Sequence, residues 1–401
     1  MLELEDAVAR ILSSLPQART ETIDLAHAHG RIVAANISAP INLPPFDNSS
    51  MDGYAVRASD LARASELTPA VLRLAGRIVA GQAPDVEVQP GRCVRVFTGS
   101  VIPPGADAVV MQEDTAIDPS NPNQIQFLET VKPWENIRFH GEDVKAGTTI
   151  LQSGQEINAA RLSILAATGI SQISVAKRPT VTLLATGSEL QQGGGTLSPG
   201  QIFESNRASL RPLIERAGGC LVRSEIVPDD PASTRRALET AFATSDMVIT
   251  CGGVSVGEMD FVKGAFEQLG GKLEFWKVAI KPGRPFVFGQ LESKFLFGLP
   301  GNPVSAFVTF LLLTRPALLG WQGAASVKLP RVRGTMAETI SNPGNRRHFV
   351  RVTIDDSGTI HSAGIQASHT LSSLANANGL LDMAPKTELQ KGAEATVMRW
   401  G

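Results

Sequence analysis

The sequence predicts a multidomain α/β protein, and three stretches of different character lead to that prediction. Residues 180–323 alternate apolar, strand-like runs with helical runs, which is typical of a parallel sheet covered by helices on both faces. Residues 40–133 contain short β-like pieces separated by glycine and proline, and the chain from about residue 328 again alternates in short strands. We therefore expect one three-layer α/β/α domain together with two β domains.

The central stretch predicts its elements one by one. Continuous apolar runs indicate strands that are buried on both faces, and Asp230 before a proline marks the start of a helix. Ligands are expected outside the carboxyl ends of such strands. The expected strands are 181–185, 221–227, 247–251, 275–280, 286–289 and 295–299, and the expected helices are 207–217, 231–243, 261–269 and one that begins at residue 303.

The flanking stretches have their own signals. Apolar residues at helical spacing predict a helix over residues 3–15, and a second helix is expected over 155–169, ending at Gly169. Short strands are expected at 53–56, 71–74 and 93–97 in the β insert, and at 348–354 in the C-terminal part.

Composition excludes several classes of function. The 401 residues carry a formal net charge of −2 and one tyrosine, Tyr54, so neither a basic field nor aromatic residues between basic runs favour nucleic acid. The acidic N-terminus does not resemble a signal peptide, and the longest apolar run, 306–313, is too short to span a membrane. Three dispersed cysteines, Cys93, Cys220 and Cys251, are expected to be reduced and buried, as in a cytoplasmic protein.

The stretch 277–285 is the strongest candidate for binding an anion. As a single strand it would place Lys277 and Lys281 on one face and Trp276, Val278 and Ile280 on the other, buried face. The two ammonium groups would then lie roughly 13 Å apart, so both could serve one long anionic ligand. An ordinary half-exposed strand with solvated lysines is the alternative.

Two carboxylates follow neighbouring strands of the central stretch. Glu189 comes directly after a strand and a glycine, and Asp229 and Asp230 lie at the next strand-to-helix junction. Mg²⁺ commonly uses one or two carboxylates together with phosphate oxygens, so Glu189 and Asp230 are candidate metal ligands. An exposed loop glutamate and a helix cap are the alternatives, and spacing does not decide between Asp229 and Asp230.

Two further loops of the central stretch could contact a ligand. The glycine-rich residues Gly252, Gly253, Ser255 and Gly257 could offer backbone amides to an oxyanion, although they form neither a P-loop nor a dinucleotide motif. Asp260, which follows, could instead cap a helix. In the loop 299–303 a rigid turn with Asn302 as a helix cap is as consistent with the sequence as ligand contact.

The β insert and the stretch after it add weaker candidates. Asp52 and Thr98 each stand beside a glycine, where a β-turn is the ordinary explanation. Arg138 could grip a phosphate with its forked guanidinium, and Asp143 adds a carboxylate, but a surface turn explains both equally well.

Taken together and in this order, seven motifs resemble the molybdopterin molybdenumtransferase family, which comprises the MoeA proteins and the E domain of gephyrin. The motifs are SSMDGYAV, FTGSVIPPGADAVVMQE, NIRFHGEDV, ATGSEL, CGGVSVGEMD, FWKVAIKPGRP and GLPGNPVSA. They span nearly the whole chain. One departure is Arg284, where many members have lysine, and its planar fork alters how an anion would be positioned.

The resemblance implies four parts and a homodimer. The parts are an α/β hinge domain (1–43 and 135–178), an inserted β domain (44–134), a three-layer molybdopterin-binding domain (179–325) and a C-terminal β-barrel (326–401). It implies two active clefts per dimer, each combining the three-layer domain of one subunit with the Asp52 and Thr98 region of the other.

The resemblance also implies the reaction: Mg²⁺-dependent insertion of molybdate into adenylylated molybdopterin, with release of AMP. The family's site residues fall on Asp52, Thr98, Asp143, Glu189, Asp230, Asp260, Lys277, Lys281, Pro300 and Pro303. In this scheme Glu189 and Asp230 hold Mg²⁺, while the two lysines hold molybdate and the pterin phosphate, assisted by the 252–257 amides. Asp52, Asp143 and Asp260 would orient the attacking group, and Thr98 would donate a hydrogen bond.

Two other functions fit the same resemblance. A molybdopterin adenylyltransferase would make the adenylylated intermediate rather than consume it, and such an enzyme is also a candidate partner. A gephyrin-like scaffold would bind proteins without catalysis. The long β insert, the C-terminal barrel and the lysine strand favour the transferase over the first, and the retained carboxylates favour it over the second.

Overall fold

The computed structural model of the chain describes residues 1–254 and 261–400, and the chain divides into two compact units. One unit comprises Met1–Ala35, Ser153–Asn158 and Ile173–Gly401, and the other comprises Asn36–Gln152 and Ala159–Gln172. The four domain boundaries expected from the sequence stay a prediction.

The second unit is built on a six-stranded β-sheet, in agreement with the expected β insert. Its strand order is β7-β4-β6-β5-β9-β8, and β5 and β6 are its one parallel pair among the described pairings. Tyr54 and Phe127 pack edge to face in its core, with ring centroids 5.8 Å apart. The strands are β4 (Gly53–Val56), β5 (Ala70–Ile78), β6 (Arg92–Val96), β7 (Ala108–Met111), β8 (Thr115–Ile117) and β9 (Gln124–Phe127).

Smaller elements complete this unit. They are β2 (Ile37–Ser38), β3 (Asn48–Ser49), β10 (Ile137–Arg138), β11 (Thr149–Leu151), α2 (Ala159–Ala167), and the short helices η2 (Ala58–Leu61) and η3 (Gln112–Asp114). The helix expected over 155–169 is therefore shorter, because Glu156 pairs with Ile32 in a β-bridge instead of entering the helix. Gly169 follows it with a φ of 81°, as a glycine stop requires.

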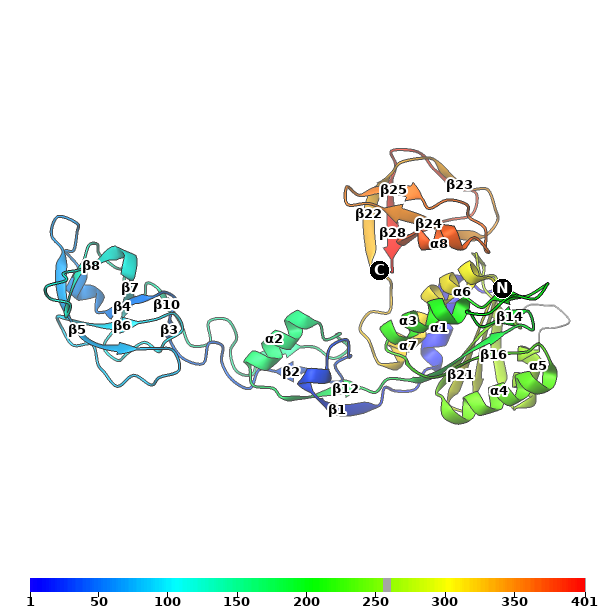
Figure 1. The fold of residues 1–401 in the computed structure, drawn as a ribbon, viewed down its shortest axis with the longest axis horizontal. Coiled ribbons are helices and arrows are strands. Elements are labelled where there is room, and N and C mark those ends of the chain that lie inside the picture. Colours follow the sequence, from blue (N-terminus) through cyan, green and yellow to red (C-terminus); the bar gives the residue numbers. More distant parts are fainter. Residues whose placement is uncertain (255–260, 401) are drawn as a thin grey trace. The chain divides into compact units, whose positions relative to one another are not determined.

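The first unit contains a sheet with helices on both faces, as expected (Figure 1). On one face α1 (Leu4–Ser14), α3 (Asn206–Arg216) and the helical stretch from Pro303 share a core with Leu183 and Ile249. On the other face α4 (Pro231–Thr244) and α5 (Val262–Gln268) share a core with Leu184 and Val248. Successive strand residues thus point to opposite faces, and both faces are dry.

The strand order of this sheet is β16-β13-β17-β21-β20-β18. The sheet is mixed rather than wholly parallel, because β20 is antiparallel to both β21 and β18. It follows that β18 runs in the same direction as β13, β16, β17 and β21, so the carboxyl ends of these five strands lie at one edge. The strands are β13 (Thr180–Thr186), β16 (Cys220–Val227), β17 (Met247–Cys251), β18 (Lys272–Lys277), β20 (Pro285–Leu291) and β21 (Lys294–Leu299).

The expectation of one continuous strand through the lysine-rich stretch is wrong. Strand β18 ends at Lys277, and β19 (Ile280–Lys281) pairs with β24 (Arg347–Ile354) of a different sheet. Val278 and Ile280 are fully buried as expected, but Trp276 is 38% exposed and does not share their face. The reason is that backbone pairing switches sheets between the two lysines, which breaks the two-residue alternation. The 13 Å spacing of a straight strand therefore does not apply.

The C-terminal residues form a closed β-barrel, as expected. Its pairings run β24-β25-β22-β28-β26 and return to β24, and β19 adds a strand beside β24. Met336, Val352 and Leu381 belong to its core. The strands are β22 (Arg331–Met336), β24 (Arg347–Ile354), β25 (Thr359–Ser362), β26 (Gly379–Met383) and β28 (Glu394–Arg399).

Short elements make up the rest of the first unit. They are β1 (Thr20–Asp24), η1 (Leu25–His27), β12 (Gln172–Ala176), β14 (Leu190–Gln191), β15 (Ile202–Phe203), β23 (Ile340–Asn342), α8 (Leu371–Ala375) and β27 (Thr387–Leu389). Cys220 is exposed, contrary to expectation, because it is the first residue of β16, at the amino-terminal edge of the sheet. Cys93 and Cys251 are buried, and all three cysteines are free thiols.

The apolar run near residue 310 is part of a longer helical stretch than expected. It comprises α6 (Pro303–Thr309), η4 (Phe310–Thr314) and α7 (Arg315–Trp321). Within the described residues this is the one stretch long and apolar enough to cross a membrane, and 83% of its most apolar window is buried inside the protein. It packs in the same core as α1 and the sheet, so it serves as a core helix.

Candidate functional site

The carboxyl edge of the three-layer sheet gathers four loops that carry expected site residues. The loops after β13 and β16 are joined by a hydrogen bond from the Gly187 amide to the Val227 carbonyl, 3.1 Å long. The loops after β17 and β21 are joined by a bond from the Gly252 amide to the Leu299 carbonyl, 3.0 Å long. Because the parent strands are neighbours in the sheet, all four loops form one continuous rim.

Glu189 lies in the turn after β13 and is exposed. Its side chain folds back over Gly187, where a Cβ atom would meet the Glu189 carboxylate oxygen Oε2 at 2.7 Å. Any larger residue at position 187 would therefore displace this carboxylate. The structure keeps Glu189 at the rim, where its oxygens remain available to a ligand.

Asp229 ties the Glu189 turn to the next loop. Its Oδ2 accepts a 3.2 Å hydrogen bond from the Ser188 amide, and its own amide donates a 2.9 Å bond to the Ser188 hydroxyl oxygen. This reciprocal pair holds the carboxylates of both loops at one part of the rim. The sequence left Asp229 and Asp230 undecided, and the structure gives Asp229 this fastening role.

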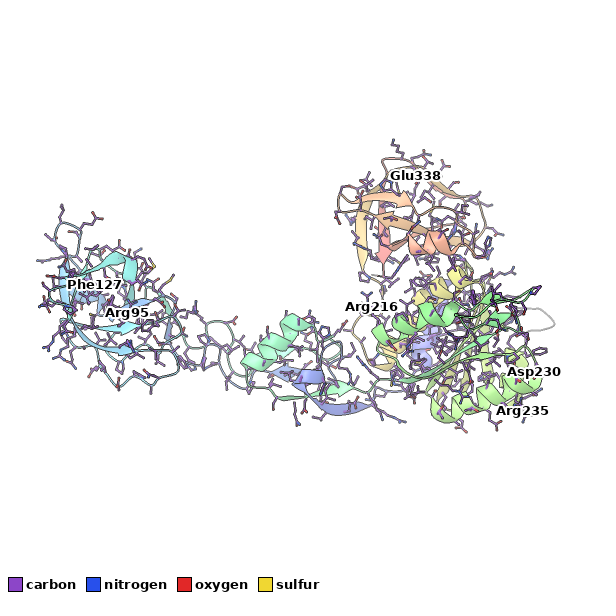
Figure 2. All side chains as sticks on the ribbon, in the orientation of Figure 1. Arg95, Phe127, Arg216, Asp230, Arg235 and Glu338 are labelled. Carbon is purple, nitrogen blue, oxygen red and sulfur yellow. The ribbon has the colours of Figure 1, made fainter. Side chains whose placement is uncertain are left out.

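Asp230 is the N-cap of α4, as expected, and lies at the start of that helix (Figure 2). Its Oδ1 accepts a 2.8 Å hydrogen bond from the Ser233 amide. That bond, above all, lowers the pKa of Asp230 below its ordinary value. The Asp230 carboxylate is thus charged at neutral pH, and its Oδ2 is not the oxygen that accepts the Ser233 capping bond.

Capping and metal binding by Asp230 are separable by mutation. We expect Asp230→Ala to lower the free energy of unfolding, because the helix loses its cap, whereas Asp230→Asn retains a capping oxygen and most of that stability. Both variants should lose Mg²⁺-dependent activity. Chemical denaturation combined with a Mg²⁺ titration checks this, and an Asp230→Asn variant with wild-type Mg²⁺ dependence would assign Asp230 to capping alone.

The glycine-rich loop begins with a close approach of backbones. A Cβ atom on Gly252 would lie 2.6 Å from the Thr186 carbonyl oxygen, and one on Gly253 would lie 2.6 Å from the Val262 side chain. Both glycines also have positive φ angles, 95° and 67°. The predicted site residues Ser255, Gly257 and Asp260 lie outside the described residues.

Lys277 is the last residue of β18, so it lies at the same edge of the sheet as Glu189. Lys281 and Arg284 lie in the connection from β18 to β20, which leaves and re-enters the sheet at that edge, and both are exposed. Lys281 pairs in register with His348 of the barrel. Burial, followed by the nearby Lys281 charge, lowers the pKa of His348 to about 4, so this imidazole is neutral.

The loop after β21 packs against two other segments. The Gly301 carbonyl accepts a 2.8 Å hydrogen bond from the Asn206 side chain. Asn302 precedes α6, but its side chain does not cap the helix as expected, because its amide donates a 3.2 Å bond to the Ser368 hydroxyl oxygen. Pro300 is buried, and Pro303 is the first residue of α6. These contacts make the loop a fixed wall of the rim.

In the second unit the structure brings Asp52 and Thr98 together. Asp52 Oδ1 accepts hydrogen bonds from the Thr98 amide, at 2.8 Å, and from the Thr98 hydroxyl, at 2.9 Å. The amide bond and then the hydroxyl bond lower the pKa of Asp52, with a smaller contribution from the charge of Arg95. Asp52 is therefore ionised at neutral pH, and the role of Thr98 as a donor in the reaction stays a prediction.

The Thr98 hydroxyl can be tested through the titration of Asp52. Thr98→Val keeps the amide bond and removes the hydroxyl bond, so we expect the pKa of Asp52 to rise towards its ordinary value. Because the folded pKa is depressed, the stability linked to Asp52 is present above its unfolded pKa of about 3.9 and is lost as the pH falls through the folded pKa. The variant should lose this contribution at a higher pH than the wild type. An NMR titration of the Asp52 carboxyl carbon measures the shift, and an unchanged pKa would contradict the assignment.

Arg138 and Asp143 lie in the same unit and are both exposed. Arg138 belongs to β10 and pairs with Asn48 of β3, and the Asp143 amide donates a 3.0 Å hydrogen bond to the Leu43 carbonyl. Backbone pairing therefore fixes their positions, while the guanidinium and the carboxylate face outwards. Both a phosphate contact by Arg138 and a surface turn fit these positions.

The donor set at the rim is compatible with Mg²⁺ in its usual manner of binding. Among the described residues no group of three or more histidine, cysteine or acidic side chains is arranged as a metal cage. Mg²⁺ seldom needs one, since it is bound through one or two carboxylates together with substrate phosphates and water. Glu189 and Asp230, brought to neighbouring loops by the Ser188–Asp229 bonds, meet that requirement.

Sequence reasoning missed several residues that shape these sites. Arg95 lies over the Tyr54 ring, 4.9 Å from its centroid, and lowers the pKa of Asp52. Arg207 forms a 3.0 Å ion pair with Glu204, whose side chain is 3% exposed. The same guanidinium donates a 2.7 Å bond to Gln192, which follows the Glu189 turn. Arg95 is part of strand alternation and Arg207 of a helical run, so only the tertiary contacts reveal their roles.

Comparison with known proteins identifies the family of the chain. Three family models match consecutive parts of the chain: the MoeA N-terminal region (domain I and II) over residues 2–169, a probable molybdopterin binding domain over 182–320, and the MoeA C-terminal region (domain IV) over 333–400. A molybdopterin molybdenumtransferase of Haemophilus influenzae is 39% identical over 94% of this chain and 93% of its own length. The chain belongs to the MoeA family.

Two other relatives match this chain over all or nearly all of its length. Molybdopterin molybdenumtransferase 2 of Mycobacterium tuberculosis is 38% identical over 98% of this chain and 97% of its own length. The crystal structure of the molybdopterin biosynthesis MoeA protein from Pyrococcus horikoshii OT3 matches with a TM-score of 0.85 and 30% identity, covering 100% of both chains. The family resemblance and the multidomain α/β fold expected from the sequence are therefore confirmed.

Proposed function

We propose that this protein is a molybdopterin molybdenumtransferase, which inserts molybdate into adenylylated molybdopterin and releases AMP in molybdenum cofactor biosynthesis. The observation that carries the proposal is the rim of the three-layer sheet. There Glu189 and the Asp229–Asp230 pair, on one pair of loops, share an edge with Lys277 at the end of β18. Membership of the MoeA family, with relatives named for this activity, supports the same conclusion.

Basic and acidic residues of the chain would have different roles in the reaction. Lys277 and Lys281 bind the dianionic molybdate and the pterin phosphate, and Arg284 adds a forked cation beside them. The Gly253 amide assists with an oxyanion, whereas the Gly252 amide is bonded to the Leu299 carbonyl. Pro300 and Pro303 fix the wall of the loop beside them. In the second unit Asp52 and Asp143 orient the attacking group, Thr98 donates a hydrogen bond, and Arg138 contacts phosphate.

We further propose that Glu189 and Asp230 hold Mg²⁺. When bound there, the ion would neutralise the non-bridging oxygens of the pyrophosphate linkage. The chain's own part is to keep Asp230 ionised and to hold both carboxylates on neighbouring loops. The Ser233 amide lowers the pKa of Asp230, and the backbone of Gly187 leaves room for Glu189.

The setting of the enzyme is proposed from the family. A cytoplasmic homodimer is consistent with the reduced thiols of Cys93, Cys220 and Cys251. A molybdopterin adenylyltransferase would supply the substrate. Sedimentation equilibrium at micromolar protein should give twice the chain mass of 42.5 kDa, and a single-chain mass would remove the dimer from the proposal.

The experiment that tests the activity is molybdate-dependent release of AMP. Purified protein is given adenylylated molybdopterin and Mg²⁺, with and without molybdate, and AMP is quantified. We expect release that requires both molybdate and Mg²⁺. Incubation with ATP and molybdopterin, without molybdate, tests the adenylyltransferase alternative, and accumulation of the adenylylated product there would overturn the proposal.

A further inference from the structure

Trp276 contacts two lysines that come from different elements. The residue is 38% exposed, whereas the sequence pattern predicted a buried side chain. The Lys277 ammonium lies 3.6 Å from the ring centroid, and the Lys263 ammonium lies 4.4 Å from it. Both are cation–π contacts, in which the electron-rich face of the ring attracts the ammonium group.

The shared ring limits the separation of the two charges. Two ammonium groups at 3.6 Å and 4.4 Å from one centroid can be no more than 8.0 Å apart, the sum of those distances. Lys277 forms no salt bridge with any residue that the structure describes. Its contact with the Trp276 ring therefore offsets the repulsion that the Lys277 ammonium experiences from the Lys263 ammonium. This pair is closer than the spacing of roughly 13 Å that a straight strand would give Lys277 and Lys281.

The topology places the pair at the rim already described. Lys277 is the last residue of β18, and β18 ends at the same edge as the parallel strands. Lys263 lies in the first turn of α5, which follows the glycine-rich loop that leaves β17 at that edge. Val262, beside it, packs against Gly253, so the start of α5 is anchored to the glycine loop.

We propose that Lys263 and Lys277 together bind one tetrahedral oxyanion of the reaction, and that Trp276 is the residue that positions them. The inference rests on the proposed function and adds Lys263 and Trp276 to its machinery. An ammonium group contacts an anionic oxygen at about 2.8 Å, so an oxyanion a few ångströms across can touch both lysines over a separation of 8.0 Å or less. Molybdate and the phosphate of the nucleotide share this chemistry.

The test uses the full-length protein and four variants. Lys263→Gln removes the charge, Trp276→Leu removes the aromatic ring, and Trp276→Phe retains a ring with a weaker face. Lys272→Gln is the matched control, since Lys272 lies on the same strand, has a side chain 82% exposed and faces Glu274 at 3.7 Å. Calorimetric titrations with molybdate alone and with AMP alone give the binding constants, and AMP release gives KM and kcat. Thermal unfolding of every variant reports on the fold.

We expect Lys263→Gln and Trp276→Leu to weaken binding of one of the two anions about tenfold. They should raise the KM of the corresponding substrate by a similar factor, with kcat changed less than about threefold. The anion affected, molybdate or AMP, identifies the occupant. Trp276→Phe should recover part of the loss, which a purely structural role of the ring would not produce at equal thermal stability, and Lys272→Gln should behave as the wild type.

Other outcomes overturn the inference. Unchanged binding of both anions by Lys263→Gln would remove Lys263 from the site, and an equal loss in Lys272→Gln would reduce the effect to general surface charge. A fall in kcat alone would also contradict positioning by Trp276. If the wild type released no AMP with molybdate, the proposed function would fail, while the two titrations would still decide whether the cluster binds an oxyanion.

Discussion

Replacement of Lys277 or Lys281 by alanine is expected to lower kcat/KM for molybdate-dependent AMP release by roughly a hundredfold. Removing one fixed cation from a site where charge develops costs on the order of 3 kcal/mol, which corresponds to that factor. The fold should survive, because Lys281 is exposed and Lys277 is partly exposed at the end of its strand. Initial rates over a range of molybdate concentrations, together with thermal unfolding, measure both effects.

The control for this prediction lies on the same strand. Lys272→Ala changes the charge by the same amount at the opposite end of β18, in a side chain that is 82% exposed, so its kcat/KM should stay within about twofold of wild type. Lys277→Arg tests geometry rather than charge, and it should recover only part of the activity. Full activity in both Lys277→Ala and Lys281→Ala would refute the assignment of these two lysines.

Glu189→Gln is expected to lower AMP release by a hundredfold or more at limiting Mg²⁺. The substitution keeps size and hydrogen-bonding capacity but removes the charge that a hard divalent cation prefers. Excess Mg²⁺ should restore part of the rate, because the carboxylate of Asp230 and the substrate phosphates remain as ligands. A Mg²⁺ titration of the initial rate therefore separates weaker metal binding from a defect in the chemical step.

Glu215→Gln provides the matched control for Glu189. Glu215 is an exposed glutamate on α3 that pairs with Arg211 at 3.1 Å, a surface ion pair of small energetic value. We expect its Mg²⁺ dependence to equal that of the wild type. If Glu189→Gln matched it at every Mg²⁺ concentration, Glu189 would be an ordinary loop residue.

Elements whose signals are local could be predicted from the sequence. The buried strands β13 and β17 are continuous apolar runs, and α4 begins where Asp230 and Pro231 indicate. The carboxyl ends of β13, β16 and β17 then specify where Glu189, Asp230 and Gly252 lie, since neighbouring parallel strands end at one edge. This part of the candidate site follows from hydrophobic pattern, capping chemistry and topology.

The lysine-rich stretch could not be predicted in the same way. A two-residue period in the sequence assumes that the backbone stays in one sheet, but here β18 ends at Lys277 and β19 joins the barrel. That switch depends on pairing with His348, about 70 residues away in the chain, which no local pattern contains. Trp276 consequently faces two ammonium groups rather than the core.

A carboxylate at a strand end can hold the local structure together or bind a metal, and the sequence does not distinguish these two roles. Asp229 fastens two loops through Ser188, and Asp230 caps α4, yet both lie where a metal ligand is expected. Asn302 shows the converse, since its position fits a helix cap while its side chain bonds Ser368 instead. Residue type and spacing predict which side chains reach the rim, and the hydrogen bonds decide what each one does there.

The most direct measurement is a crystal structure of the protein with Mg²⁺ and tungstate, with tungsten located by its anomalous scattering. We expect tungstate within hydrogen-bonding distance of Lys277, at the same rim as a Mg²⁺ ion held by Glu189 or Asp230. Tungstate bound elsewhere, with the Lys277 and Lys281 ammonium groups directed away from those carboxylates, would contradict it.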